Sequence, residues 1–215
     1  MRFLFVWFVK ITGWIPHIFA FRKRIYYEDK SVQSRHIKGA AIIMSNHHRL
    51  LDFPLIMYVF FTRTVHCLVA ELMYRKNFFI TLTLNGLGAI RVDRDSHDFS
   101  FVARSCEVLR KGGVIGIFPE SKLPERDGLG LMPFKPSVAY IALLSGAPII
   151  PIYINGLYFK PGRPSRIMIG TPIDVQSMYD DSLDQKQNLD NITQKLKEKV
   201  EHLKNELEER LAQKA

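Results

Sequence analysis

The chain has 215 residues, a length that fits one domain with a substantial hydrophobic core. Apolar residues make up 47% and charged residues 24% of it, with only two cysteines, which excludes a disordered chain and a disulfide framework. The net charge of +9 favours phosphate-bearing partners such as anionic lipid or a phosphorylated substrate, and since no zinc-finger spacing or RNP motif is present, nucleic acid is not expected.

Residues 1–30 predict a membrane-associating helical segment. Apolar residues fill most of 3–21, interrupted by Lys10 and Pro16, and the basic cluster Arg22-Lys23-Arg24 follows. Because the charge comes last and no cleavage site precedes it, a cleaved signal peptide is not expected. An interfacial helix or helical hairpin fits better than a spanning helix or a soluble core helix, which remain alternatives. We therefore expect a peripheral or monotopic protein on the cytoplasmic face of the membrane.

The remaining residues, 31–215, predict a single α/β domain with a mostly parallel central sheet flanked by helices. Short apolar runs alternate with helical patterns, as in sheets whose strands are buried on both faces. Strands are expected at 40–44, 89–92, 114–118, 148–154 and 167–169, and helices at 53–61, 68–84, 99–110 and 137–145. Ligands bind at the carboxyl ends of such strands, so polar clusters that follow strands are the candidate sites.

The end of this domain, residues 185–215, predicts a long amphipathic C-terminal helix. Apolar residues recur there at intervals of three and four, and Lys and Glu fill the other positions. The stripe either packs on the domain, which is the expected role, or forms a coiled-coil seam between two chains. It consists of Leu189, Ile192, Leu196, Val200, Leu203, Leu207 and Leu211.

The strongest candidate for catalysis is the polar segment 45–52, which lies between an apolar strand and an apolar helix. A histidine beside a carboxylate can take a proton from a hydroxyl, because the carboxylate orients the ring and stabilises the imidazolium. His47 and Asp52 would point apart on a continuous helix, so their pairing requires His47 on the turn before the helix. His48, four residues before Asp52, could share a helix face with it. A capping role for these groups is the alternative.

Two further polar clusters follow predicted strands. The cluster at the end of 89–92 contains Arg91, Asp93 and Arg94, and the planar fork of an arginine suits phosphate oxygens. The cluster after 114–118 contains Glu120, Ser121 and Lys122, and it opens a long loop of the kind that is often functional. A surface ion-pair strip and a solvated turn are the alternatives.

These segments match four motifs in order and spacing. Asn46, His47 and Asp52 match Asn-His followed by four residues and Asp, and Gly88, Asp93 and Arg94 match a glycine-led pattern ending in Asp-Arg. Phe118, Pro119 and Glu120 match the start of Phe-Pro-Glu-Gly-Thr-Arg, and Pro148 to Pro151 match an apolar Pro-rich strand. Together the motifs resemble the lysophospholipid acyltransferase family, and the 1-acylglycerol-3-phosphate acyltransferases in particular. Ser121, Lys122 and Leu123 depart from the third motif, whose arginine is implied in acceptor binding.

The resemblance implies direct acyl transfer from acyl-CoA or acyl-carrier protein to the hydroxyl of a lysophospholipid, without an acyl-enzyme. It implies His47 as general base and Asp52 as the group that orients it. Cofactors and metals are not implied. Apolar side chains between 53 and 84 are candidates for an acyl channel, although core packing is the expected role for most of them. The implied substrate-binding residues are Asn46, Arg91, Asp93, Arg94, Glu120, Ser121 and Lys122.

The segment 47–52 also fits a second motif, the H-H-x-x-x-D of the chloramphenicol-acetyltransferase and condensation-domain superfamily. That superfamily uses the second histidine, here His48, and usually has Gly after the Asp, where this chain has Phe53. A non-catalytic peripheral protein that binds anionic lipid is also compatible with the sequence, and so is a thioester hydrolase. Donor, acyl chain length, acceptor headgroup and oligomeric state stay open.

Overall fold

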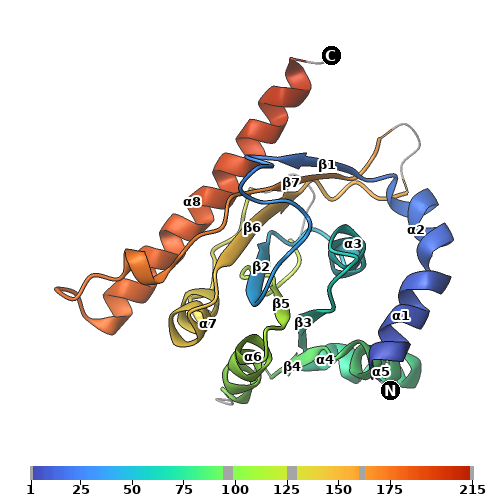
Figure 1. Ribbon diagram of the computed structural model, residues 1–215, viewed down its shortest axis with the longest axis horizontal. Coiled ribbons are helices and arrows are strands. Elements are labelled where there is room, and N and C mark those ends of the chain that lie inside the picture. Colours follow the sequence, from blue (N-terminus) through green and yellow to red (C-terminus); the bar gives the residue numbers. More distant parts are fainter. Residues whose placement is uncertain (1, 94–98, 125–129, 160–162, 214–215) are drawn as a thin grey trace.

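The computed structural model describes residues 2–93, 99–124, 130–159 and 163–213. Its strands form one seven-stranded sheet in the order β1-β7-β6-β2-β5-β3-β4, parallel except for the antiparallel pair β6 and β7 (Figure 1). The prediction of a single α/β domain with a mostly parallel sheet is confirmed. The strands are β1 (Arg24–Tyr27), β2 (Ala41–Ser45), β3 (Val65–Ala70), β4 (Ile90–Val92), β5 (Val114–Ile117), β6 (Ile149–Ile154) and β7 (Arg166–Ile169).

Helices cover both faces of this sheet (Figure 1). Successive residues of β2 point to opposite layers, as the two-residue period of a strand requires. Ile42 and Met44 pack in one apolar cluster, whereas Ala41 and Ile43 pack in the other. The first layer holds α6 (Ser100–Arg110), α7 (Ser137–Ser145) and α8 (Gln185–Ala212), and the second holds α2 (Trp14–Phe21) and α3 (Asp52–Val59).

The prediction of one helix over residues 68–84 is wrong. Its first residues belong to strand β3, and two separate helices follow, α4 (Glu71–Tyr74) and α5 (Phe78–Leu87). A short apolar run fits a buried strand as well as a buried helix, so periodicity alone does not separate them. Asn77 caps the N-terminus of α5, and its side chain accepts a hydrogen bond from the backbone N–H of Phe79 at 2.8 Å.

The helical part of the N-terminal segment ends earlier than residue 30. Helix α1 (Arg2–Thr12) is followed by α2 after a bend of 52°, and Arg22, in the left-handed region with φ 43°, ends α2. Residues 24–27 form β1, which pairs in parallel with β7. In the described chain, no single helix is long and apolar enough to cross a membrane, but α1 and α2 meet that length and composition when taken as one bent pair.

Lys10, which interrupts the apolar pattern of α1, points into the protein. Its side chain is 1% exposed, and Nζ donates to the carbonyl oxygens of Phe61 at 2.6 Å and Arg63 at 2.7 Å, just beyond the end of α3. Burial lowers the pKa of Lys10 to about 8. The lysine therefore ties α1 to the domain and leaves Phe8 and Ile11 exposed on the outer face of the helix.

The apolar stripe of α8 packs on the domain, so the coiled-coil alternative is wrong. Helix α8 begins with a capping box at Asp184 and crosses the sheet beside β6 and β7 (Figure 1). The side chains that would form a seam between two chains are instead buried in the core of this one. They are Ile192, Leu196, Val200, Leu203 and Leu207.

Candidate active site

The turn between β2 and α3 is built around the carboxylate of Asp52. Asp52 is the first residue of α3 and is fully buried. Its Oδ2 accepts hydrogen bonds from the backbone N–H groups of His48 at 2.7 Å and Arg49 at 2.8 Å, and its Oδ1 accepts one from the hydroxyl of Tyr158. These donors and the N-terminal end of the helix compensate the buried charge.

His47 pairs with this carboxylate. Its Nδ1 lies 2.8 Å from Asp52 Oδ2, and its ring stacks on Phe118 with centroids 4.3 Å apart. The five-residue separation does not prevent the pairing because the helix begins only at Asp52. When Nδ1 carries the proton and donates to Asp52, Nε2 is left with its lone pair as a proton acceptor. The geometry is that of a general base held in one tautomer.

His48 meets Asp52 through its backbone, and its ring packs elsewhere. The ring lies edge-on to Tyr153 with centroids 6.3 Å apart. Gly156 also approaches this residue closely, since a Cβ added at Gly156 would lie 2.7 Å from Cβ of His48. The four-residue spacing does not place His48 and Asp52 on one helix face, because His48 precedes the helix.

Asn46 and Glu120, expected to contact substrate, hold the turn through hydrogen bonds within the protein. Asn46 is buried, and its amide donates to the carbonyl of Ile154 at 2.9 Å and accepts from the N–H of Ile154 at 2.8 Å. Glu120 is buried and accepts from the N–H groups of His47 at 2.8 Å and Met132 at 3.1 Å. Burial raises the pKa of Glu120, and these two donors partly offset the rise. Their polar atoms are thus already used within the protein.

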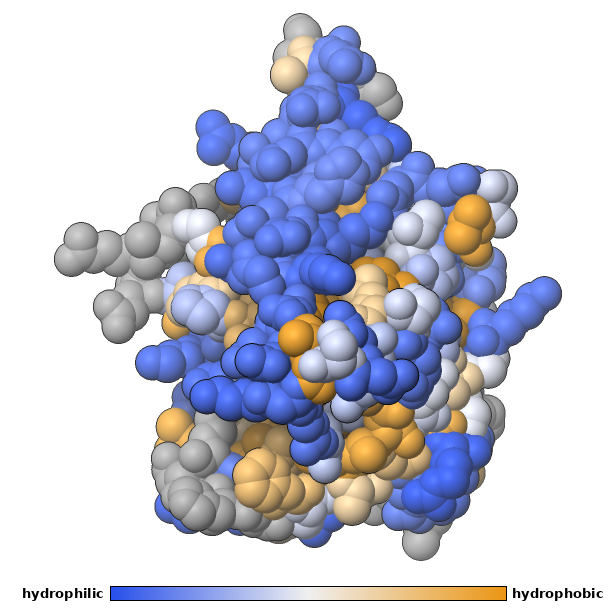
Figure 2. Space-filling view, turned by 90° about the vertical axis from the view of Figure 1, so that its left-hand side faces the viewer, coloured by the Kyte–Doolittle hydropathy of each residue, from blue (hydrophilic) through white to orange (hydrophobic). Residues whose placement is uncertain are grey.

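A cavity of about 1370 Å³ reaches Phe118, the residue whose ring stacks on His47. Its walls come from β3, β4, the end of β5, α6, α7 and the start of α8. Phe118 belongs both to the wall and to the stack on His47. Figure 2 shows apolar side chains gathered below α8, on the side of the molecule where α6 and α7 lie. Of residues 53–84, where side chains for an acyl channel were expected, Leu68 and Ala70 line this cavity.

The remaining predicted site residues separate into two groups. Asp93, Ser121 and Lys122 line the cavity. Arg91 points outward from β4, where its guanidinium pairs with Glu71, and this hydrogen bond raises the pKa of Arg91. Arg94 lies outside the described residues.

Tyr158 is a site residue that sequence reasoning missed. Its hydroxyl reaches Asp52 from a position 106 residues further along the chain, so no local pattern marks it. Burial, followed by the charge of Asp52, raises the pKa of Tyr158. The hydroxyl therefore stays protonated and can only donate to the carboxylate.

Ser121 occupies the left-handed backbone region, with φ 56°. Glycine stands at this position in the family motif that the segment resembles, and it adopts such a φ without strain. We expect Ser121→Gly to raise the free energy of unfolding by up to about 1 kcal/mol, measured as a higher melting temperature. Ser121→Ala keeps the strain and is the matched control. A glycine variant that melts below the alanine variant would contradict this.

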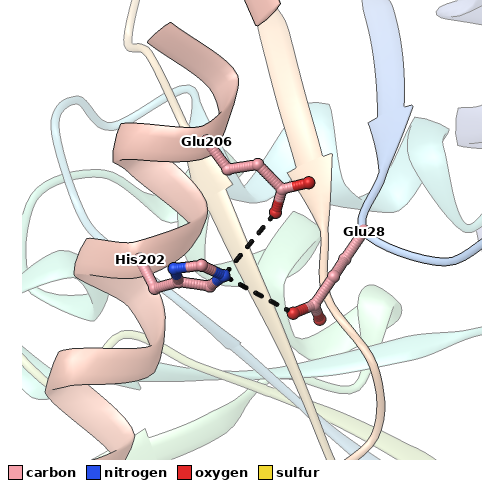
Figure 3. A group of neighbouring side chains, drawn as sticks. All are labelled: Glu28, His202 and Glu206. Atoms are coloured by element: carbon pink, nitrogen blue, oxygen red, sulfur yellow. Dashed lines mark ion pairs between the residues drawn. The ribbon is translucent and has the colours of Figure 1, made fainter. Parts of the chain in front are cut away.

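Outside the site, three described side chains lie close enough to share a metal ion. Figure 3 shows His202 of α8 with its Nε2 3.8 Å from both Glu28 Oε1 and Glu206 Oε2. The two carboxylates already pair with cations, Glu28 with Lys199 and Glu206 with Arg210. This charge balance indicates an ion-pair network that fastens α8 beside β1.

Comparison with known proteins gives a consistent result. A sequence model described as Acyltransferase matches residues 23–155. The human 1-acyl-sn-glycerol-3-phosphate acyltransferase beta is 26% identical over 145 residues, 67% of this chain and 51% of that protein. The Bacillus subtilis 1-acyl-sn-glycerol-3-phosphate acyltransferase is 25% identical over 150 residues, 67% of this chain and 71% of that one. The chain thus spans about half the length of the human relative.

The fold also resembles a solved structure. The crystal structure of the 1-acyl-sn-glycerophosphate (LPA) acyltransferase PlsC from Thermotoga maritima superposes with a TM-score of 0.60 at 21% identity, covering 86% of this chain and 73% of that one. At this identity the likeness concerns the fold. The sequence match covers more than half of the chain, including the His47–Asp52 turn and Glu120, and on this evidence the protein belongs to the acyltransferase family.

Proposed function

We propose that this protein transfers a fatty acyl group from a thioester, acyl-CoA or acyl-carrier protein, to the hydroxyl of a lysophospholipid. The acceptor proposed is 1-acylglycerol-3-phosphate, the substrate class in the names of the human and Bacillus relatives. The observation that carries this proposal is the His47–Asp52 pair beside an apolar cavity, with Phe118 between them. The cavity offers an apolar environment for an acyl chain at the base that would activate the acceptor.

The proposed reaction needs one general base and no cofactor or metal. Nε2 of His47 takes the proton of the acceptor hydroxyl as its oxygen attacks the thioester carbonyl. Asp52 holds the ring and stabilises the imidazolium. The tetrahedral intermediate collapses, the C–S bond breaks, and the departing thiolate receives the proton from His47. The products are the ester and the free thiol, so atoms and charge balance.

We also propose a membrane attachment through α1 and α2, on the cytoplasmic face. Several features support it. Both helices expose large apolar side chains, among them Phe8, Ile15 and Phe19. The N–H of Phe159 donates to the carbonyl of Ala20 at the end of α2. The preceding Tyr158 bonds Asp52, so the attached helices lie next to the catalytic turn. An acceptor in the membrane would then need to move little to reach His47.

Incubation of the purified protein with each acyl thioester and a panel of lysolipids tests this function. The expected product is a diacyl phospholipid, formed fastest with 1-acylglycerol-3-phosphate. Free fatty acid without a lipid product would instead identify a thioester hydrolase. If no thioester is consumed with any acceptor, the proposal is overturned, and the remaining interpretation is a non-catalytic lipid-binding protein.

Arg94→Ala is expected to weaken binding of the acceptor far more than binding of the acyl donor. We propose that Arg94, together with Lys122, binds the acceptor phosphate, because the motif that Arg94 matches implies this role. Loss of a charge-assisted hydrogen bond costs about 1.5–3 kcal/mol, or roughly tenfold to a hundredfold in affinity. Steady-state kinetics that vary each substrate measure the effect. Arg91→Ala, which removes one of the two arginines paired with Glu71, is the matched control. Equal changes in both Michaelis constants would contradict the role.

A further inference from the structure

Helix α5 presents large apolar side chains to solvent. Phe78 is 74% and Phe79 73% exposed, and Leu82 is also exposed, on a helix of 10 residues. The opposite side of the helix buries Leu84 and Leu87 in the protein. Soluble surfaces rarely gather such side chains without a partner, so the exposed side of α5 is a candidate contact surface.

This surface is continuous with that of α1. Phe5 of α1 lies over Gly86 of α5, since a Cβ added at Gly86 would be 2.4 Å from the Phe5 ring. Phe79, Leu82 and Gly86 are three and four residues apart and therefore lie along one side of the helix. Helix α1 thus packs on the same side of α5 that carries the exposed residues, and the two helices lie side by side in Figure 1. The combined surface, here called the α1–α5 apolar face, consists of Leu4, Phe8, Phe78, Phe79 and Leu82, all exposed.

The charges beside this face are positive. Lys76 lies two positions before α5, and residues 72–92 contain no Asp or Glu, nor do residues 1–27. Arg75 and Arg91 both pair with Glu71, so this group of three also keeps one net positive charge. An apolar face with a basic border suits acyl chains below anionic headgroups. A second copy of this chain would bring the same positive border to the interface, and like charges oppose such pairing. The charge distribution therefore favours an anionic bilayer over self-association.

We propose that the α1–α5 apolar face lies in the surface of an anionic bilayer, so that α5 forms a second membrane contact beside the N-terminal helices. This extends the membrane attachment proposed above and does not depend on acyl transfer. Phe78 and Phe79 would enter the boundary between headgroups and acyl chains, and Lys76 would remain among the headgroups.

Flotation of the full chain with phosphatidylcholine vesicles, with and without phosphatidylglycerol, tests this inference. Phe78→Ser with Phe79→Ser is expected to lower partitioning roughly tenfold or more, because two phenyl groups lose their apolar environment. Tyr179→Ser is the matched control, since Tyr179 is an exposed side chain between β7 and α8, outside the α1–α5 apolar face, and its partitioning should not change. Lys76→Glu should weaken binding only to vesicles that contain phosphatidylglycerol.

Further variants separate this inference from the attachment through α1 and α2. Phe78→Leu with Phe79→Leu should restore most of the binding, which guards against a folding defect in the serine variant. If Ile15→Ser with Phe19→Ser, two exposed residues of α2 outside this face, abolishes flotation while the α5 serine variant floats like the wild type, the N-terminal attachment stands and the α5 contact is overturned. A wild type that self-associates without vesicles, and an α5 variant that is monomeric yet floats normally, would assign the face to a second copy and also overturn it.

Discussion

Replacing His47 with alanine is expected to lower the rate of acyl transfer by roughly 10²–10⁴, the usual cost of losing a general base. The physical reason is the position of its ring, whose Nδ1 meets Asp52 at 2.8 Å and leaves Nε2 to take the acceptor proton. Asp52→Asn should cause a comparable loss, because an amide can present its N–H to Nδ1 and favour the wrong tautomer. Initial rates with saturating thioester and lysophospholipid measure both variants.

His48→Ala is the matched control for this prediction. The ring of His48 packs against Tyr153, and its contact with Asp52 is made by the backbone N–H, which alanine retains. We therefore expect this variant to keep a readily measured rate. Thermal melts of all variants establish that each is folded. A folded but inactive His48 variant, together with an active His47 variant, would reverse the assignment and favour the condensation-type chemistry.

Asn46→Ala is expected to destabilise the protein rather than to raise a Michaelis constant selectively. The substitution leaves the buried N–H and C=O of Ile154 without their partner, at about 1–3 kcal/mol each. A total of about 2–6 kcal/mol should lower the melting temperature by roughly 4–24 °C in a domain of this size. Calorimetry or circular dichroism measures the shift.

Asn191→Ala, which changes an exposed amide of α8, provides the comparison and should shift the free energy of unfolding by no more than about 0.5 kcal/mol. An Asn46 variant with an unchanged melting temperature and a raised Michaelis constant for the acceptor would show that the amide contacts substrate after all. The experiment thus separates the role expected from the motif from the role seen in the hydrogen bonds.

The fold class could be predicted from the sequence because its signals are local. The alternation of apolar runs with helical patterns depends on near neighbours, and so does the α8 stripe that is now seen buried on the sheet. The error at residues 68–84 has the same origin. The last three residues of β3, Leu68 to Ala70, are all apolar, so their pattern merges with that of the helices that follow.

The inward orientation of the Lys10 side chain could not be predicted from the neighbouring sequence. In sequence it is a charge that divides an apolar segment, yet its ammonium donates to carbonyl groups more than fifty residues away, at Phe61 and Arg63. Because these partners lie inside the protein, the lysine turns inward and the outer side of α1 stays apolar. From composition alone, the charge would be expected to interrupt that surface.

The sequence by itself selected the segment 45–52, the family and the two competing histidines. Only the tertiary structure showed that the ring of His47, and not that of His48, pairs with Asp52. It also showed that Asn46 and Glu120 hold the turn through internal hydrogen bonds. The physical reason is that the turn is held by long-range hydrogen bonds to buried groups: Tyr158 to Asp52, Glu120 to the N–H of His47, and Asn46 to Ile154. Each joins residues between 73 and 108 positions apart, and such pairings exist only once the sheet has brought the ends of β2, β5 and β6 to one edge.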